Sequence, residues 1–224
     1  KIDMNTDKIE EKIKTLQSTL ISEEDNPFEG VEKEAYIDFI NFTSGLDFYS
    51  GREDKILEAL PYIAKRSNKI GIDIDASESL PNALTDIDNL ELLGFGDIKK
   101  WDSPINLGKL LQLKAFSIRG GDFVQLPKEI SDLINLHTLE FSNTSLNSIP
   151  TSIDSLKKLN VLSFEENKIS DIKPITELTE LKILRLKVNA IDVLPASIKN
   201  LRKLQLLDLA DNLISNLPVE IEDL

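Results

Sequence analysis

Residues 181–217 read LKILRLKVNAIDVLPASIKNLRKLQLLDLADNLISNL, and this stretch decides the fold. The pattern L-x-x-L-x-L-x-x-N-x-I-x-x-L-P-x-x-I-x-x-L begins at Leu181 and starts again at Leu204. Further units begin upstream at intervals of 22 or 23 residues, at Leu159, Leu136, Leu113 and Leu90, and offsets of Ile70 and Leu80 place one more at Ser67. A regular period of this length predicts a solenoid, in which each unit forms one coil.

Each unit opens with apolar residues at alternate positions, as in Leu139 and Phe141, which is typical of a half-buried strand. An asparagine follows at the point where the chain must leave the sheet, at Asn167, Asn189 and Asn212. Turning backbone between coils needs hydrogen-bond partners for its N–H and C=O groups. The sequence therefore predicts one strand per unit, with one face of the sheet turned inward.

This pattern resembles the leucine-rich repeat family. The resemblance implies an α/β fold, a right-handed solenoid of about seven repeats with a parallel concave sheet, and asparagines that bond neighbouring turns as a ladder. The upstream ladder positions depart from the family, with Thr144, Gly121, Ile98 and Asp75. The 22-residue unit is similar to internalin-type repeats, because its L-P-x-x-I-x-x-L spacing is replaced by Ile172, Lys173, Pro174, Ile175 and Leu178.

The first 66 residues follow a helical period instead. Apolar residues recur at helical spacing in three segments, with Ile9, Ile13, Leu16 and Leu20 in the first, Val31, Ala35, Tyr36, Phe39 and Ile40 in the second, and Ile56, Leu57, Leu60 and Ile63 in the third. Thr43 to Gly45 and Ser50-Gly51 are the expected breaks around the second and third helices. We predict a helical N-terminal cap, residues 1–66, on a solenoid, residues 67–224. A separate, aromatic-rich binding domain is the alternative reading of the cap.

The composition excludes several classes of partner and site. A net charge of −13 and a pI near 4.6 argue against nucleic acid and anionic membranes, and favour either simple solubility or steering toward a basic partner. No apolar run is long enough for membrane insertion. The absence of cysteine removes disulfides and thiolate sites. The resemblance implies in addition that a eukaryotic extracellular setting is unlikely, because such members of the family usually carry cysteine-rich caps. Localisation stays open, with a bacterial exported, cell-surface or cytoplasmic protein favoured.

No motif for catalysis, a cofactor or a metal stands out. His137 is the only histidine and lies beside core Leu136 at a strand start, where a surface or edge role is expected. Gly94-Phe95-Gly96 fails the dinucleotide fingerprint, since Lys99 stands where its third glycine belongs. We therefore predict a protein that is not an enzyme and binds no cofactor or metal ion.

Alternate strand residues point away from the core, so the residues of the concave face can be named. We select as partner-binding candidates Leu92, Arg119, Glu140, Glu165, Arg185, Lys187 and Asp208. A solvated face of weak cross-strand ion pairs is the competing interpretation of these charges. Farther upstream, Gly71, Gly94 and Gly96 leave the sheet nearly bare. Either the N-terminal segment folds over that part, or a bulky group of a partner fits there.

The expected function is non-catalytic recognition of another protein through the concave sheet and its rims. One alternative is a cell-surface or polysaccharide-binding module of an exported bacterial protein, which the scarcity of concave aromatics disfavours. Another is the targeting domain of a larger enzyme. The last coil would leave Leu207, Leu209 and Ile221 uncovered, so we expect that the native protein continues past Leu224 or self-associates through this C-terminal repeat.

Overall fold

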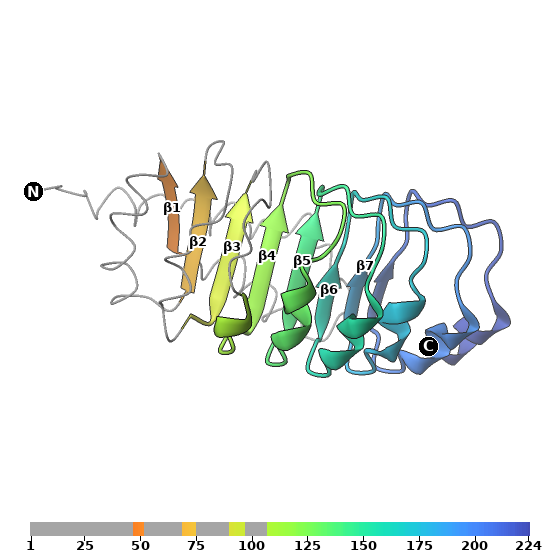
Figure 1. Ribbon diagram of the computed structural model, residues 1–224. Helices are drawn as coiled ribbons and strands as arrows, with labels where there is room; N and C mark the ends of the chain where they lie inside the picture. Colours follow the sequence, from red (N-terminus) through yellow and green to blue (C-terminus); the bar gives the residue numbers. More distant parts are fainter. Residues whose placement is uncertain (1–46, 52–68, 75–89, 97–106) are drawn as a thin grey trace, which may run out of the picture.

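The computed structural model describes residues 47–51, 69–74, 90–96 and 107–224. In these residues the strands form an eight-stranded sheet in which sequence neighbours pair in parallel (Figure 1). The strands are β1 (Asp47–Gly51), β2 (Lys69–Ile74), β3 (Leu92–Gly96), β4 (Ala115–Arg119), β5 (Thr138–Ser142), β6 (Val161–Ser163), β7 (Ile183–Arg185) and β8 (Leu206–Asp208). One strand per unit, with right-handed parallel connections, confirms the predicted solenoid.

Short 3-10 helices return the chain from one strand to the next. They are η2 (Leu107–Lys109), η3 (Lys128–Asp132), η4 (Thr151–Ser155), η5 (Lys173–Glu177), η6 (Ala196–Asn200) and η7 (Val219–Asp223). A proline precedes four of them, for example Pro150 with φ −68° before η4, because its fixed φ suits the extended entry. Consecutive i to i−3 bonds, such as Ile153 N to Pro150 O at 3.1 Å and Leu156 N to Ile153 O at 3.0 Å, define the 3-10 geometry.

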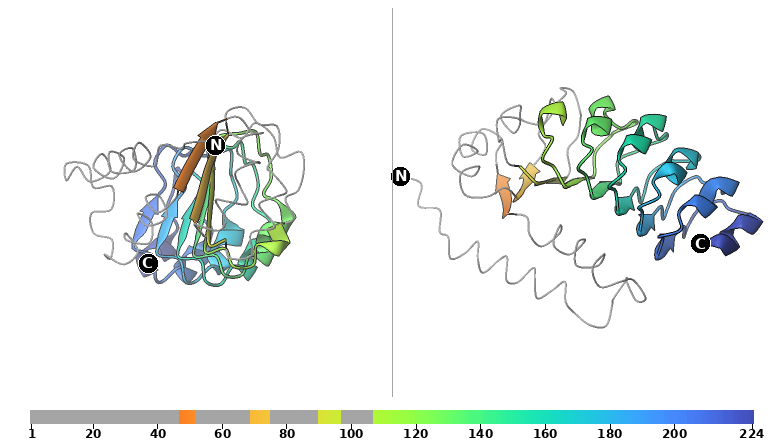
Figure 2. Two further views of the ribbon diagram at one scale, coloured as in Figure 1. Left: turned by 90° about the vertical axis from the view of Figure 1, so that its left-hand side faces the viewer. Right: turned by 90° about the horizontal axis from the view of Figure 1, so that it is seen from below.

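The helices lie along the outer side of a curved arc, and the strands lie along its inner side (Figure 2). The 22-residue unit keeps this plan. Val161 of β6 pairs with Ile183 of β7, and the return through η5 has five residues like its neighbours. The shorter unit therefore leaves strand register intact, as expected for a deletion on the convex side.

The sheet begins one strand earlier than predicted. We expected Ser50-Gly51 to be a break between helices, but Asp47–Gly51 is strand β1 and pairs with β2 in the register Asp47 to Ile70. The 23-residue interval thus continues upstream of Ser67. The pattern hid this strand because Asp47 stands at the register position that an apolar residue holds in the later coils. The three predicted helices fall on residues outside the described ranges, so the helical cap stays a prediction.

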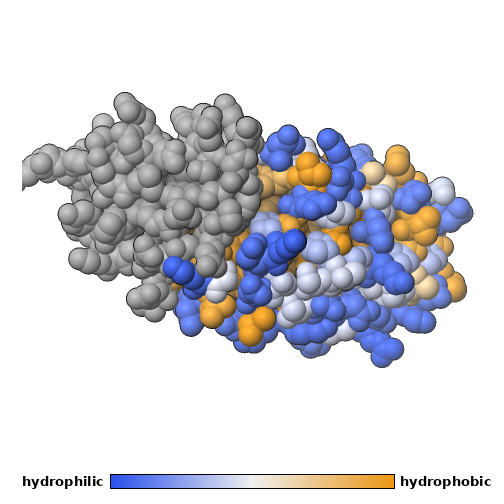
Figure 3. Space-filling view, viewed as in Figure 1, coloured by the Kyte–Doolittle hydropathy of each residue, from blue (hydrophilic) through white to orange (hydrophobic). Residues whose placement is uncertain are grey.

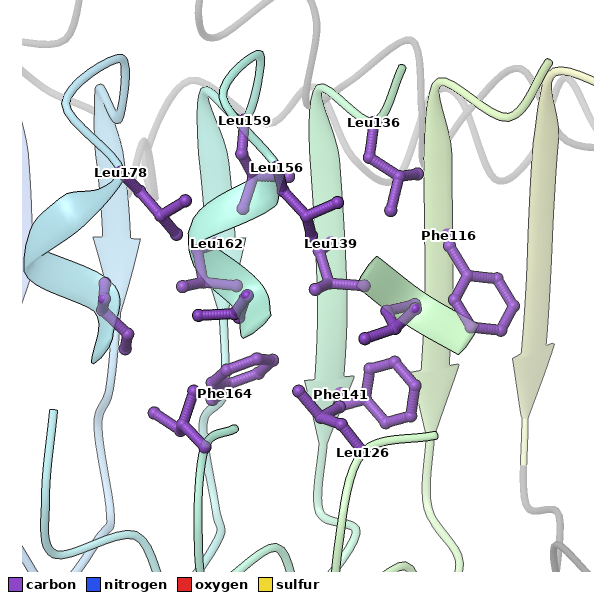
Figure 4. Close-up of a cluster of buried hydrophobic side chains, with 14 of the residues drawn as sticks. Phe116, Leu126, Leu136, Leu139, Phe141, Leu156, Leu159, Leu162, Phe164 and Leu178 are labelled. Atoms are coloured by element: carbon purple, nitrogen blue, oxygen red, sulfur yellow. The ribbon is translucent and has the colours of Figure 1, made fainter. Parts of the chain in front are cut away.

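The core fills the space between the sheet and the 3-10 helices. Inward residues of the strands meet residues of the helices in one continuous apolar cluster, and Figure 4 shows its central part. Phe116, Phe141 and Phe164 are its largest fully buried side chains, and they follow one another through the coils. Their rings meet edge to face, at 5.6 Å between Phe116 and Phe141 and 6.5 Å between Phe141 and Phe164.

The predicted asparagine ladder is present in the C-terminal coils. Asn167 accepts hydrogen bonds at Oδ1 from the backbone N–H groups of Thr144 (3.2 Å) and Leu146 (2.9 Å), and donates from Nδ2 to Phe141 O (2.6 Å). Asn189 and Asn212 repeat the pattern one and two coils later, donating to Phe164 O and Leu186 O. Upstream, the Thr144 hydroxyl donates to Asn167 Oδ1 at 2.9 Å, so the threonine joins the end of the ladder.

The turn after each strand passes through the left-handed region. Gly120, Asn143, Glu166, Val188 and Asp211 all have φ between 54° and 79° at the equivalent position of five successive coils. Glycine and asparagine adopt this conformation readily, whereas a β-branched residue such as Val188 is strained there. The repeated turn sets the direction in which the chain leaves the sheet at the carboxyl ends of the strands.

Candidate interaction surface

The parallel register arranges the residues of the concave face in rows that cross the strands. The first row, which we call the apolar row, consists of Leu92, Ala115, Thr138, Val161, Ile183 and Leu206. The next row contains Ser117, Glu140, Ser163, Arg185 and Asp208. Arg119 and Ser142 lie beyond it, at the carboxyl ends of β4 and β5, and Glu165 and Lys187 follow β6 and β7. We call the charged residues Arg119, Glu140, Glu165, Arg185, Lys187 and Asp208 the charged strip.

Arg119 and Glu140 form the best-defined pair of the charged strip. The guanidinium of Arg119 donates from Nε to Oε1 of Glu140 at 2.9 Å and from Nη2 to Oε2 at 3.1 Å. The carboxylate is buried and also accepts from the hydroxyls of Ser117 (2.8 Å) and Ser142 (3.3 Å). Two-point pairing with a buried, hydrogen-bonded carboxylate fixes the Arg119 head group, although its side chain remains 56% exposed.

Glu165 lies among charges of both signs. Its Oε2 is 3.6 Å from Nη1 of Arg185, and the Ser163 hydroxyl donates to it at 3.5 Å. Burial raises the pKa of this carboxyl above its usual value, and the negative charges of Asp208 and Glu140 add to the rise, while Arg185 and Lys187 oppose it. The nearby cations therefore do not fully offset the cost of desolvating this carboxylate.

The structure does not bring all the predicted site residues together. Lys187 reaches the exposed Asp211 at 3.9 Å, a residue that sequence reasoning did not select. Asp208 accepts from the backbone N–H of Ala210 at 3.0 Å and so caps its own turn. Leu92 lies apart from the charges, partly buried against Ala115. The charged strip is thus two paired centres, Arg119 with Glu140 and Glu165 with Arg185, with Leu92 separate from both.

Sequence reasoning missed the apolar row as a feature. We expected an open concave face, but Ala115 and Thr138 are 3% exposed, Val161 is 1% exposed and Ile183 is 0% exposed. The signal was present in the sequence, where the first residue of each strand is apolar or threonine in every coil from Leu92 on. It was overlooked because alternation tells which face a side chain occupies and not how much of its surface is exposed.

Three further observations concern metal ligands, the histidine and membrane-spanning helices. Within the described residues, no group of three or more His, Asp or Glu side chains is placed to hold a metal ion. His137 is half-buried and its Nδ1 lies 2.9 Å from Asn135 O, which confirms the edge role expected for it. No helix in the described ranges is long and apolar enough to cross a membrane.

The opposite face has a different character. The face that carries the 3-10 helices is largely hydrophilic, with apolar residues scattered over it and several of them near the C-terminal end (Figure 3). In the last two coils, Val193 and Leu213 are each 66% exposed and Leu217 is 62% exposed. Leu204, Leu207 and Ile221, which pack on the core, are only partly buried.

Comparison with known proteins agrees with this geometry. Residues 84–171 match a family model described as a leucine-rich repeat region. A leucine-rich repeat protein of Leptospira interrogans is 26% identical, with a TM-score of 0.61, and the match covers 79% of this chain and 50% of that one. An internalin of Listeria monocytogenes, InlF, is 21% identical with a TM-score of 0.55, over 68% of this chain and 44% of that one.

The leucine-rich repeat domain of the type III effector XopL is 17% identical with a TM-score of 0.63, and the match covers 96% of this chain and 83% of that domain. A search of the curated proteins gave no match. The chain spans about half the length of the Leptospira protein and of the internalin. The repeats, the parallel sheet and these likenesses show a leucine-rich repeat solenoid fold. This fold is in general a protein-interaction fold rather than a catalytic one.

Proposed function

We propose that this leucine-rich repeat protein is a non-catalytic recognition module that binds a protein partner through the charged strip and the rims of the concave sheet. The observation that carries the proposal is the fixed geometry of the strip. Arg119 is held by two bonds to Glu140, while 56% of its side chain faces solvent. Ordered charged groups lose less side-chain entropy on binding than free ones, which favours a complementary partner.

The distribution of charge supports the same surface. Arg119, Arg185 and Lys187 place three cations on one face of a chain whose net charge is −13. Glu140 and Glu165 lie between Arg119 on one side and Arg185 with Lys187 on the other, so cations flank two carboxylates along the sheet. A strip of mixed sign favours a partner with a matching arrangement of charges over a simple polycation or polyanion, because misaligned like charges repel.

The test is a double charge reversal, Arg185→Glu with Lys187→Glu, compared with Lys199→Glu and Arg202→Glu. Both pairs change the net charge by the same amount, and Lys199 and Arg202 are exposed residues in and just after η6 on the convex side. Partner proteins are recovered from the source cells on immobilised chain and identified by mass spectrometry. We expect the strip variant to lose at least about ten-fold in recovery of the partner, equal to about 1.4 kcal/mol.

Circular dichroism and the unfolding midpoint are measured alongside the recovery assay to check that the variant is folded. This control is needed because a glutamate in place of Arg185 would place a third negative charge beside Glu165 and Asp208. A partner retained by the strip variant and lost by the η6 variant would place binding on the convex side and refute the proposal. Loss by both variants would indicate dependence on net charge alone, which also contradicts a defined strip.

The other expected roles have less support. A polysaccharide-binding module would favour exposed aromatic side chains, and the aromatic residues Phe95, Phe116, Phe141 and Phe164 are all buried. The role of a targeting domain in a larger enzyme stays a prediction. Self-association through the last coil also stays a prediction, for which the exposed Leu213, Leu217 and Val219 provide an apolar surface.

A further inference from the structure

The guanidinium of Arg119 has a second edge that its bonds to Glu140 do not use. A guanidinium carries five N–H donors in one plane, one on Nε and two on each Nη. Nε and Nη2 donate to the two carboxylate oxygens of Glu140, at 2.9 Å and 3.1 Å. The other edge consists of Nη1 and the remaining N–H of Nη2. Because the group is planar, that edge is directed away from Glu140.

The surroundings of Arg119 leave room for a ligand group. Its side chain is 56% exposed, whereas that of Glu140 is 7% exposed, so the exposed part of the pair belongs mainly to the arginine. Within the described part of the chain, both side-chain hydrogen bonds of Arg119 go to Glu140. The register places Gly96 of β3 beside Arg119, and a glycine contributes no side chain to that side. A glycine in a strand often marks the close approach of another backbone or a ligand.

The second edge also has a fixed direction. The carboxylate that holds Arg119 is itself held by the hydroxyls of Ser117 at 2.8 Å and Ser142 at 3.3 Å. A side chain that is already ordered loses little freedom on binding. Lys187, on the same face, approaches Asp211 only at 3.9 Å, and an ammonium group is a point charge without a planar edge. Arg119 therefore combines exposed donors with a fixed orientation.

The chemistry of this edge selects the kind of ligand. Two parallel N–H donors match the two oxygens of a carboxylate or of a phosphate. Charge favours the carboxylate, because a phosphorylated side chain carries about −1.5 to −2 charges and the chain has a net charge of −13. The carboxylates of Glu140 and Glu165 lie on the same face and add to this repulsion. A singly charged acid is repelled least.

We propose that the Nη1–Nη2 edge of Arg119 is an anchor site for a carboxylate of the partner, supplied by an aspartate or glutamate side chain or by a C-terminus. Glu140 holds the other edge of the guanidinium and so sets the direction of the anchor. This inference rests on the proposed function, because it names the chemical group that the charged strip recognises in a protein partner. Arg119 then contributes two-point geometry, whereas Arg185 and Lys187 contribute charge.

The test variant is Arg119→Lys, because lysine keeps the positive charge and lacks the two-point edge. Arg202→Lys, at an exposed position on the convex side, is the matched control. The probes are two phage libraries of short random peptides, one with the random segment enclosed in the coat-protein fusion and one with it at a free C-terminus. Peptides are selected that prefer the wild-type chain over the Arg119→Lys chain.

Each selected peptide is then synthesised with and without its carboxylate. An acidic residue is replaced by its amide, or a free C-terminus is amidated, and dissociation constants are measured by calorimetry. We expect loss of the carboxylate to weaken binding about ten-fold on wild type and on Arg202→Lys, and less than about two-fold on Arg119→Lys. Coupling of this kind assigns the contact to Arg119. The replacement that couples shows whether a side chain or a C-terminus supplies the acid.

An equal loss on wild type and on Arg119→Lys would overturn the inference, because the carboxylate would then bind elsewhere. A selection in which no peptide prefers wild type over Arg119→Lys would overturn it as well. Urea unfolding checks that Arg119→Lys is folded. If it is not, unaltered protein decides: the side-chain ¹⁵N signals of Arg119 should shift on addition of an acidic peptide selected on wild type and stay in place with its amide counterpart. Equal shifts with both peptides would refute the anchor.

The proposed function and this inference can fail separately. The strip reversal, Arg185→Glu with Lys187→Glu, leaves Arg119 in place. A partner that is lost by the strip reversal and bound unchanged by Arg119→Lys would overturn the anchor and leave the proposed function standing. Coupling of peptide carboxylates to Arg119, together with a partner that the strip reversal does not affect, would support the anchor and contradict the proposed function.

Discussion

The two halves of the described solenoid satisfy the backbone groups of their turns in different ways. The coils that start at Leu113 and Leu136 centre on Phe116 and Phe141 and bear strands of five residues, whereas the coils that start at Leu159, Leu181 and Leu204 carry the asparagine ladder and strands of three residues. In the first half, turn backbone is bonded mainly to backbone, as in Phe123 N to Thr144 O at 2.6 Å. In the second half, side-chain amides add further bonds to backbone bonds of this kind, such as Asn167 N to Val188 O at 3.0 Å.

The two systems overlap in one coil. Phe164 closes the aromatic series, and Asn167, three residues later, opens the ladder. The comparison teaches that the ladder is one way of satisfying the turns and not a condition of the fold. Both halves bury apolar side chains in one core, but the first contains most of the phenylalanine series and the second adds the hydrogen bonds of the ladder. The two halves should therefore respond differently to substitution.

The largest expected effect is on the aromatic half. Phe141→Ala should lower the free energy of unfolding by about 4 kcal/mol, because Phe141 is fully buried and contacts Phe116, Phe123 and Phe164 edge to face. The measurement is equilibrium unfolding in urea. Leu186→Ala, at the equivalent position of the ladder half, is the matched comparison and should cost less. An equal or larger loss of unfolding free energy for Leu186→Ala would show that the two halves do not differ in this way.

The second expected effect concerns the asparagine ladder of the other half. Asn167→Ala should cost about 3 kcal/mol, because it leaves the buried Leu146 N–H without its side-chain acceptor and removes the donor to Phe141 O. Asn160→Ala is the control, since its amide donates only to Lys158 O at an exposed site. The difference in urea midpoint between the two variants measures the ladder. A loss at Asn167 no greater than at Asn160 would show that the ladder carries little stability.

The smallest effect concerns pH and the charged strip. The folded pKa of Glu165 is raised, so its ionised form lowers stability above that pKa, and this cost disappears as pH falls below the usual value of 4.5. Glu165→Gln should therefore match or exceed the wild type in stability at pH 7, by less than about 1 kcal/mol, and lose that advantage at pH 4. Urea unfolding at both pH values checks this, with the exposed Glu166→Gln as control. Clear destabilisation at pH 7 would mean that the Arg185 pair outweighs desolvation.

The sequence predicted the fold through particular residues. Leu181, Leu184 and Leu186 repeat at fixed offsets, and the inward side of the sheet follows from them because alternation and period are local properties of the chain. Strand β1 escaped the prediction because Asp47 stands at a position that is apolar in the later coils, while pairing with β2 follows from the register of the whole sheet. Local pattern cannot supply that information.

The candidate surface was predicted less completely. The residues of the charged strip follow from strand alternation, but their partners do not. Arg119 of β4 pairs with Glu140 of the neighbouring strand β5 in a diagonal position, and Lys187 reaches Asp211 beyond the strand end. Such choices depend on side-chain rotamers and on burial. The low exposure of Val161 and Ile183 likewise does not follow from strand alternation, which gives the face of a side chain and not its burial.

The side-chain hydrogen bonds between coils have a kinetic consequence. Every such bond among the described residues joins positions 20 to 26 apart, as in Lys157 to Glu177 and Asn167 to Phe141. Divided by the chain length, this separation gives a relative contact order of about 0.1, a value typical of chains that fold quickly. Each coil needs only its neighbour, so folding spreads along the axis from whichever coils form first. Under tension along its axis, the solenoid would unravel in coil-sized steps rather than break as a unit.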